Sequence, residues 1–478
     1  MKPADPFIRT RIVATLGPAT EPPGRLESLL EAGVNVCRLN FSHGTHAQHL
    51  LALERVRAWS TEQDRAVAVL GDLCGPKIRL NAVAGGKATL KVGDRVSIVR
   101  GDADCTAEQL TITYPTLLDE LSVGHRVFID DGLVRLLVVD HDEERAVCTC
   151  TVGGVISTRK GVNLPDTRLN TPALTDKDRA DLEWAIANRL DYVALSFVRT
   201  PYDLIDLRKA IDRARGSVGI ISKIEKVEAL EHLDEILALS NGIMVARGDL
   251  GVEMDAWQVP LVQKSLTARC REVGKPVIIA TQMLQSMIST PVPTRAEISD
   301  VANAILDGVD AVMLSAETAS GEFPLAAVEI MRRVATATEA FRSESRSETT
   351  DERAGGGEPR AAALAEGAAR TALHLGAKLV AVWTTSGDTV RLMARYRLPM
   401  PVVGLTAAPA VARRMGLLYG VVPVCVPGHE HPAALLGALN TILKRRSLAA
   451  VGELVVVLAS TQPTQRGATD TVMIHRVE

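Results

Sequence analysis

Short β-branched runs alternate with segments of helical periodicity along most of this chain, and this alternation limits the possible folds more than any other feature. Three such runs come before an interruption and five come after it. They are Arg11–Gly17, Val34–Phe41, Ala66–Asp72, Tyr192–Val198, Val218–Ile224, Gly242–Ala246, Pro276–Thr281 and Ala311–Ser315. Strands that are each followed by a helix form parallel sheets, and eight such units predict a closed (β/α)8 barrel. An open, doubly wound sheet is the competing topology.

The interruption and the C-terminal part of the chain predict two further domains. Val-rich segments punctuated by glycine, without helical periodicity, predict a small β-barrel inserted at residues 81–165. We therefore expect the large barrel to comprise residues 1–80 and 166–342. A polar, Gly-rich stretch predicts a linker over residues 343–359, and strand and helix patterns beyond it predict a smaller α/β domain over residues 360–478.

Composition excludes several classes of protein. Hydrophobic residues make up 46% of the 478 residues and the formal net charge is only -3, so nucleic acid and anionic membranes are not expected partners. No apolar run approaches the roughly 20 residues that span a bilayer, and residues 1–11 contain no apolar signal segment. Seven cysteines without metal-ligand spacing indicate reduced thiols. We expect a cytoplasmic protein.

Charged and hydrogen-bonding side chains occur at the C-terminal ends of six of the eight predicted strands. These residues are Arg38, Asn40, Ser42, His43, Asp72, Lys77, Arg79, Lys223, Glu225, Arg247, Asp249, Thr281, Gln282, Ser315 and Glu317. Barrel active sites lie at this end of the strands. Six converging polar ends are hard to explain as structure alone, because burying unpaired charges is costly.

These residue types favour phosphoryl chemistry. Glu225 and Asp249 offer hard oxygen ligands suited to Mg2+ or Mn2+. Lys223 and Arg38 place positive charge beside that metal, as a transferring phosphoryl group requires. The Gly248–Gly251 turn can offer backbone N–H groups to a carboxylate. An ion pair with a neighbouring lysine is the alternative reading of Glu225.

Several long motifs, in a fixed order, resemble the pyruvate kinase family across nearly the whole chain. They are Ile12–Pro18, Arg38–Gly44, Gly161–Pro165, Ile221–Glu225, Met244–Gly251, Ala280–Leu284, Pro293–Glu297, Ser299–Ala304 and Leu314–Thr318. The resemblance implies transfer of the phosphoryl group of phosphoenolpyruvate to ADP, giving pyruvate and ATP, as the last step of glycolysis. It also implies a homotetramer, a β domain that acts as a lid, and a regulatory C-terminal domain.

The resemblance also implies roles for single residues. Lys223 would stabilise the migrating phosphoryl group, Arg38 would contact it, and Glu225 and Asp249 would hold the metal. Thr281 would contact the substrate carboxylate or enolate. The carboxylate pocket would comprise Ala246, Arg247, Gly248 and Asp249, and the nucleotide site Asn40, His43, Arg79 and Lys160. Ser315, like Thr281, is a candidate for proton delivery through water, but it is explained equally well as a hydrogen-bonding strand end.

Two departures from the family pattern concern cations and effectors. The run Asp72–Arg79 carries Lys77 where many members have Glu, near a K+ site formed by positions Asn40, Ser42, Asp72 and Leu73. This matches the family subgroup that needs no K+, with the Lys77 ammonium serving instead; a surface lysine without a catalytic part is the alternative. The loop that resembles the effector phosphate site comprises Thr384, Thr385, Ser386, Gly387 and Thr389. Asp388 stands there where a basic residue is common, so fructose 1,6-bisphosphate is expected to activate poorly.

Two other functions compete with the kinase. A metal-dependent lyase or aldolase acting on pyruvate enolate would use the same carboxylates but would not need Arg38, Asn40, Arg79 or a lid. A catalytically inactive regulatory paralogue would be expected to have lost Lys223 or a metal carboxylate, and all three are present.

Overall fold

Eight parallel strands close into a barrel in the computed structural model, which describes residues 7–344, 359–426, 432–460 and 469–478. The strands are β1 (Arg11–Leu16), β2 (Val36–Asn40), β3 (Ala68–Asp72), β12 (Tyr192–Leu195), β13 (Gly219–Ile224), β14 (Gly242–Ala246), β15 (Val277–Ala280) and β16 (Ala311–Leu314). They follow one another in chain order around the barrel, and β1 pairs with β16 to close it. The predicted barrel is confirmed, and the open sheet is wrong.

Helices surround the barrel, because each strand is buried on both faces and its outer face needs cover. The helices are α1 (Arg25–Glu31), α2 (His46–Glu62), α4 (Asp176–Ala187), α5 (Pro201–Arg213), α6 (Glu228–Glu231), α7 (Leu233–Leu239), α8 (Arg247–Glu253), α9 (Val259–Glu272), α10 (Arg295–Asp307), α11 (Ala316–Ala319) and α12 (Pro324–Glu344). Short 3-10 turns lie at Pro18–Thr20 and Gln285–Ile288. Thr45, Thr175 and Thr294 each accept a backbone N–H at the start of a helix, which fixes where α2, α4 and α10 begin.

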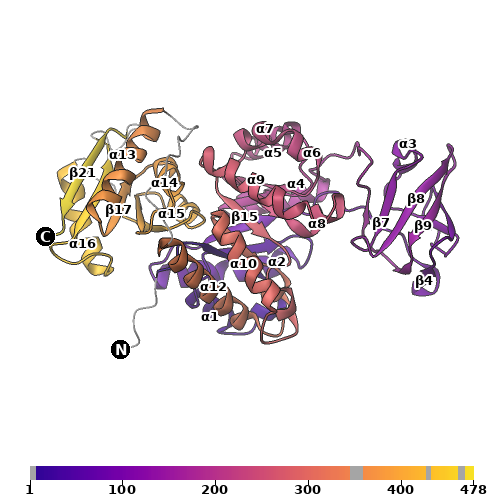
Figure 1. Cartoon of the computed structure of the whole chain (residues 1–478), viewed down its shortest axis with the longest axis horizontal. Helices are drawn as coiled ribbons and strands as arrows, with labels where there is room; N and C mark the ends of the chain where they lie inside the picture. The colour runs from indigo at the N-terminus through magenta and orange to yellow at the C-terminus, as the bar shows by residue number, and fades with distance from the viewer. Residues whose placement is uncertain (1–6, 345–358, 427–431, 461–468) are drawn as a thin grey trace.

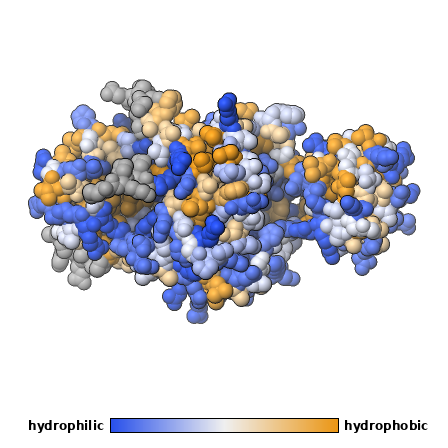
Figure 2. Space-filling view, turned by 90° about the horizontal axis from the view of Figure 1, so that it is seen from below, coloured by the Kyte–Doolittle hydropathy of each residue, from blue (hydrophilic) through white to orange (hydrophobic). Residues whose placement is uncertain are grey.

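A β domain with its own core is inserted between β3 and β12. Its elements are a 3-10 turn (Ala84–Gly86), β4 (Lys87–Leu90), β5 (Arg95–Val99), β6 (Gln109–Thr111), α3 (Leu117–Glu120), β7 (Arg126–Ile129), β8 (Val134–His141), β9 (Arg145–Val152), β10 (Gly154–Ser157) and β11 (Val162–Asn163). We call this domain the lid. It projects from one end of the barrel as a separate lobe (Figures 1 and 2).

The predicted β insert is built of two sheets. Six strands form one sheet in the order β11-β7-β8-β9-β5-β6, and β10 pairs with β4 in a separate two-stranded sheet. The chain leaves the larger sheet at Gly153, where a Cβ atom would lie 2.7 Å from the Leu90 carbonyl oxygen. Only glycine permits that close approach, which directs β10 toward β4.

The C-terminal domain contains one five-stranded sheet between helices. Among the described residues of this domain, its strands are β17 (Leu379–Trp383), β18 (Val402–Thr406), β19 (Val421–Cys425), β20 (Leu454–Ala459) and β21 (Thr471–Arg476), and of these only β21 is antiparallel. The helices are α13 (Pro359–Leu375), α14 (Asp388–Ala394), α15 (Pro409–Met415) and α16 (Pro432–Arg445). The predicted α/β domain is confirmed. Most of the predicted linker lies outside the described residues.

The C-terminal domain packs against the end of the barrel opposite the lid (Figure 1). Leu417 joins the cluster of side chains that fills the barrel interior. Asp310 accepts hydrogen bonds from the Val277 amide of the barrel, from Tyr419 and from the Arg397 guanidinium. The barrel therefore has its floor closed by the C-terminal domain and its mouth facing the lid. Within the described ranges, no helix is sufficiently long and apolar to cross a membrane.

Candidate active site

Four charged side chains from three strand ends contact one another at the mouth of the barrel. The Lys223 ammonium lies 2.8 Å from Glu225 Oε1 and 3.4 Å from Asp72 Oδ1. Arg38 Nε donates to Asp72 Oδ2 at 2.7 Å. One buried carboxylate, Asp72, thus contacts two cations at the mouth.

Burial and neighbouring charges shift the titration of this group. Burial alone would raise the pKa of Asp72, but Lys223 and Arg38 hold that pKa below its usual range. Burial would lower the pKa of Lys223, but Asp72 and Glu225 raise it. Both residues are therefore ionised at neutral pH. Burial and the nearby Glu225 raise the pKa of Asp249, so this carboxylate lacks sufficient positive charge around it.

A cleft of about 340 Å³ separates the mouth from the lid and receives residues from both. Its wall includes Lys77, Arg79, Phe197, Lys226 and Asp249 on the barrel side and Asp130, Asp131 and Lys160 on the lid side. Lys160 Nζ lies 2.8 Å from Asp130 Oδ2, and Arg79 Nη1 donates to the Arg159 carbonyl at 2.8 Å. Three predicted site residues from distant parts of the chain, Arg79, Lys160 and Asp249, therefore line one cavity.

Thr281 has a strained backbone next to the Gly248 turn. Its φ is +68°, in the left-handed region that β-branched residues avoid, and the next residue, Gln282, has a φ of +56°. The Thr281 hydroxyl accepts from the Gly248 amide at 2.7 Å. The Arg247 guanidinium donates to Asp300 at 2.7 Å and to the Thr281 carbonyl at 3.0 Å. Arg247 therefore joins this corner to Asp300 of helix α10.

Lys77 lies over the loop that follows β2. Its ammonium donates to Ser42 Oγ at 2.8 Å, and the Ser42 amide donates to Asn40 Oδ1 at 3.1 Å. Partial desolvation lowers the pKa of Lys77, and the charges of Arg79 and Lys223 add to this effect. The ammonium thus contacts one of the predicted cation-site positions, Ser42, whose amide in turn binds Asn40. His43, also in this loop, is exposed, and desolvation and nearby cations lower its pKa.

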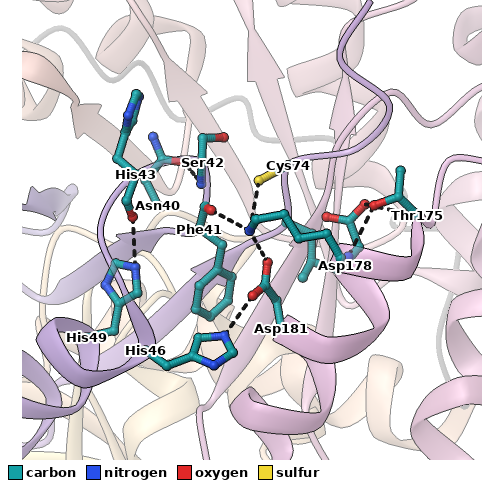
Figure 3. Close-up of polar contacts among 12 residues, drawn as sticks. Asn40, Phe41, Ser42, His43, His46, His49, Cys74, Thr175, Asp178 and Asp181 are labelled. Carbon is teal, nitrogen blue, oxygen red and sulfur yellow. Dashed lines mark hydrogen bonds and ion pairs between the residues drawn. The ribbon is translucent and has the colours of Figure 1, made fainter. Parts of the chain in front are cut away.

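Side chains of helix α4 contact this loop (Figure 3). Lys177 donates to the Phe41 carbonyl at 2.7 Å and to Asp181 at 2.6 Å, and it lies 3.5 Å from Cys74 Sγ. Asp178 accepts from the Gly75 amide at 3.2 Å. The loops after β2 and β3, which carry the predicted cation and nucleotide residues, are therefore both fastened to the first turn of α4.

The remaining predicted residues have mainly structural contacts. Ala246 is buried at the end of β14, and the Ser315 amide donates to Glu317 at 2.7 Å. In the predicted effector loop, the Thr384 hydroxyl accepts from Gly387, and the Ser386 hydroxyl donates to Asp388. Thr389 pairs with Thr469 at 2.9 Å. Asp388, in the first turn of α14, thus already engages one hydroxyl predicted to receive an anion.

Sequence reasoning missed four residues at the mouth. Ser196 and Phe197 directly follow β12; the Ser196 hydroxyl binds Lys223, and the Phe197 amide binds Glu225. Asp130 and Asp131, in a lid turn with φ of +54° and +55°, face the cleft. A polar residue at a strand end was the available signal for Ser196. The paired acids of the lid turn had no such signal, because a polar turn is ordinarily solvated.

Cations and carboxylates that converge at the mouth of a barrel, under a lid, form the site of a phosphotransferase. Family models described as "Pyruvate kinase, barrel domain" and "Pyruvate kinase, alpha/beta domain" match residues 7–328 and 362–475. This chain belongs to the pyruvate kinase family.

Individual relatives agree with that assignment. A pyruvate kinase of Geobacillus stearothermophilus is 41% identical over 480 residues, covering 98% of this chain and 80% of that protein. One of Staphylococcus epidermidis is 38% identical over 472 residues, with the same coverage. The crystal structure of a pyruvate kinase from Cryptosporidium parvum matches with a TM-score of 0.90 and 33% identity, covering 98% of this chain and 96% of that one.

Proposed function

We propose that this chain transfers the phosphoryl group of phosphoenolpyruvate to ADP with the help of Mg2+ or Mn2+ and without K+. The observation that carries the proposal is the joint contact of Lys223 and Arg38 with Asp72 at the barrel mouth, beside two carboxylates. In this reaction the bond between phosphorus and the enolate oxygen breaks, a bond to a terminal oxygen of ADP forms, and the enolate carbon takes up a proton.

Glu225 and Asp249 are the residues that would hold the divalent metal. Their oxygen atoms suit Mg2+ or Mn2+, and the raised pKa of Asp249 supports the role, because two neighbouring buried carboxylates need a counter-charge. When bound, the metal supplies positive charge to substrate oxygens. The protein supplies the rest of the charge through Lys223 and Arg38, which Asp72 holds ionised and oriented.

The carboxylate of phosphoenolpyruvate and the phosphates of ADP would bind to different residues at the mouth. The Gly248 turn and Thr281 would receive the carboxylate of phosphoenolpyruvate. The strained Thr281 backbone supports this role, because such strain persists where function requires a fixed geometry. Arg79 and Lys160 line the cleft and would bind the phosphates of ADP, with Asn40 and His43 in the adjoining loop.

Lys77 is the basis for the absence of a K+ requirement. Its ammonium donates to Ser42 and is close enough to Asp72 for the two charges to interact. A fixed ammonium at this position supplies the positive charge that K+ would supply and repels a second cation. The homotetramer, the cytoplasmic location, the regulatory role of the C-terminal domain and weak activation by fructose 1,6-bisphosphate stay predictions.

An assay of pyruvate formation from phosphoenolpyruvate, with and without ADP, tests the proposal. The kinase requires ADP and forms ATP in equal amount. A lyase or aldolase would cleave or form a carbon–carbon bond of a different substrate without nucleotide, and an inactive paralogue would form no pyruvate. Lys223→Met should lower kcat much more than it raises KM, because its charge matters most in the transition state. ADP-independent turnover, or none, would contradict the proposal.

A further inference from the structure

The Ser196 hydroxyl lies between the catalytic lysine and the backbone of the loop after β3. Ser196 is 2% exposed. Its oxygen accepts a hydrogen bond from Lys223 Nζ at 2.7 Å and donates one to the Leu73 carbonyl at 2.7 Å. Because a hydroxyl has a single hydrogen, the bond to Leu73 turns an oxygen lone pair toward the ammonium. An oxygen lone pair in this direction can accept a hydrogen bond from the lysine N–H.

The next residue binds the neighbouring carboxylate. The Phe197 amide donates to Glu225 Oε2 at 2.7 Å, while Glu225 Oε1 accepts from Lys223. Phe197 has a φ of +54°, a strained conformation for an aromatic residue. A Cβ atom on Gly75 would lie 2.6 Å from the Phe197 ring, so the loop after β3 packs directly on this corner.

We propose that Ser196 is a positioning residue, which fixes the direction of the Lys223 ammonium and couples it to the loop of residues 73–77. Lys223 has three N–H groups, directed at Asp72, Glu225 and Ser196. Asp72 also binds Arg38, and Glu225 also binds Phe197, whereas the Ser196 oxygen is the one uncharged acceptor of the three. Lys77 belongs to the same loop, so its contact with Ser42 and the position of Lys223 become linked through Leu73.

Removing the hydroxyl should affect catalysis more than binding. In Ser196→Ala the ammonium keeps its charge and both carboxylate partners, so attraction of the substrate changes little. The direction of one N–H is lost, and a small misplacement of a catalytic group costs up to about 100-fold in rate. We expect kcat to fall by about 10- to 100-fold while KM for phosphoenolpyruvate changes by less than about threefold.

Ser222→Ala is the matched control. Ser222 precedes Lys223 on β13, is equally buried, and its hydroxyl pairs with Ser240 at 2.5 Å, on the side away from the mouth. It should lose a comparable amount of stability with kcat within about twofold of wild type. Ser196→Cys, nearly the same size but with a weaker acceptor, should fold and give an intermediate kcat. Unchanged kcat in Ser196→Ala or Ser196→Cys would overturn the proposal.

The expected loss of kcat rests on the proposed function. A second measurement therefore tests the contact of Ser196 without using activity. Hydrogen exchange measured by mass spectrometry on the peptide that contains residues 72–80 should be faster in Ser196→Ala and unchanged in Ser222→Ala. If the wild type forms no pyruvate, the proposed function fails, and this exchange rate alone decides the link between Ser196 and the loop. Equal exchange in wild type and Ser196→Ala would contradict the link.

Discussion

At the scale of single residues, the carboxylates of the site differ in how much positive charge lies next to them. Asp72 contacts two cations and Glu225 one, whereas burial and the charge of Glu225 disfavour ionisation of Asp249. Positive charge in the protein is therefore concentrated on the side of Asp72. The side of Asp249 needs charge from a ligand, and this asymmetry leads to the first prediction.

Asp249→Asn should abolish catalysis and yet stabilise the metal-free protein at high pH. The pKa of Asp249 in the folded chain is about 7, above its usual value of 3.8, so ionisation of Asp249 destabilises the fold as the pH rises through this interval. In EDTA, the variant should melt above wild type at pH 8, and the difference should shrink toward pH 5. Mg2+ should raise the melting temperature of wild type only. An equal melting temperature in EDTA at both pH values would contradict this account.

The activity of the same variant should fall by at least about 100-fold, because loss of groups that merely orient a metal ligand already costs about 10- to 100-fold. Steady-state turnover with increasing Mg2+ measures this loss. Asn303, on the outer helix α10, offers a control: Asn303→Ala changes only a surface contact with Lys264 and should keep wild-type turnover. Normal turnover in Asp249→Asn would remove this residue from the metal site.

Lys77→Glu should create a need for K+. Wild type should keep near-full activity in tetramethylammonium buffer, because the Lys77 ammonium is fixed at Ser42. The substitution changes the local charge by two units and should make turnover rise by about tenfold or more when K+ is added. Lys209→Glu, at an exposed position on α5, should stay insensitive to K+. A wild-type enzyme that K+ activates tenfold would show that Lys77 is only a surface lysine.

Several site residues could be predicted from the sequence because a barrel brings strand ends together whatever their separation in the chain. Asp72, Lys223 and Glu225 converge for this reason. Arg247 begins α8 directly after β14, and its guanidinium binds Asp300 of α10 as well as the Thr281 carbonyl. Ser196 was missed because its partner is a lysine 27 residues away, a contact that the sequence alone does not show.

At the scale of secondary-structure elements, strand centres were more predictable than strand ends. The predicted Gly242–Ala246 agrees with β14, because a glycine marks its start. The predicted Val34–Phe41 is longer than β2, because apolar residues continue into the flanking turns. Strands β19 and β21 were missed, since each lies at a sheet edge and has a mixed, partly exposed surface.

The lid should be separable from the barrel. Its core is its own, and the two chain segments that join it to the barrel pair with each other, with the Val162 amide donating to the Ile78 carbonyl at 2.9 Å. Replacing residues 80–161 by two glycines should leave a folded barrel that binds Mg2+ and lacks kinase turnover, because Lys160 and the cleft wall are lost. Circular dichroism and the coupled assay check both parts.

A milder variant controls for damage by the deletion. Lys160→Met removes one lid charge that faces the cleft, and Lys87→Met removes an exposed charge elsewhere on the lid. Lys160→Met should raise KM for ADP, and Lys87→Met should leave this KM unchanged. Kinase turnover that survives the deletion would show that the lid has no part in catalysis.

At the scale of the whole molecule, buried polar contacts join the C-terminal domain to the barrel. Arg397 is 6% exposed and donates to both oxygens of Asp310 and to the Gly308 carbonyl. On the other side of the floor, Asp191 binds Arg413 of the C-terminal domain and Arg57 of the barrel. Such pairs are sensitive to the loss of one partner, because the other charge stays buried.

Arg397→Ala should therefore weaken the junction between the two domains by about 3–5 kcal/mol. Calorimetry should show separate unfolding transitions where wild type shows coupled ones, and limited proteolysis should release the C-terminal domain earlier. Arg370→Ala, which removes an exposed pair with Glu366 on α13, should change stability by less than about 1 kcal/mol. Indistinguishable melting of Arg397→Ala and wild type would contradict a structural role for this pair.

The position of Leu417 inside the barrel has a consequence for biosynthesis. The eighth barrel strand ends at Leu314, so the residue that fills the floor leaves the ribosome about 100 residues later. At ordinary rates of translation, this delay lasts roughly 5–20 s. During that time the nascent barrel exposes apolar interior side chains at its open floor, such as Tyr192 at the start of β12. A chaperone that recognises apolar surface would bind the nascent chain in this interval. The chain would no longer need it once Leu417 packs into the barrel.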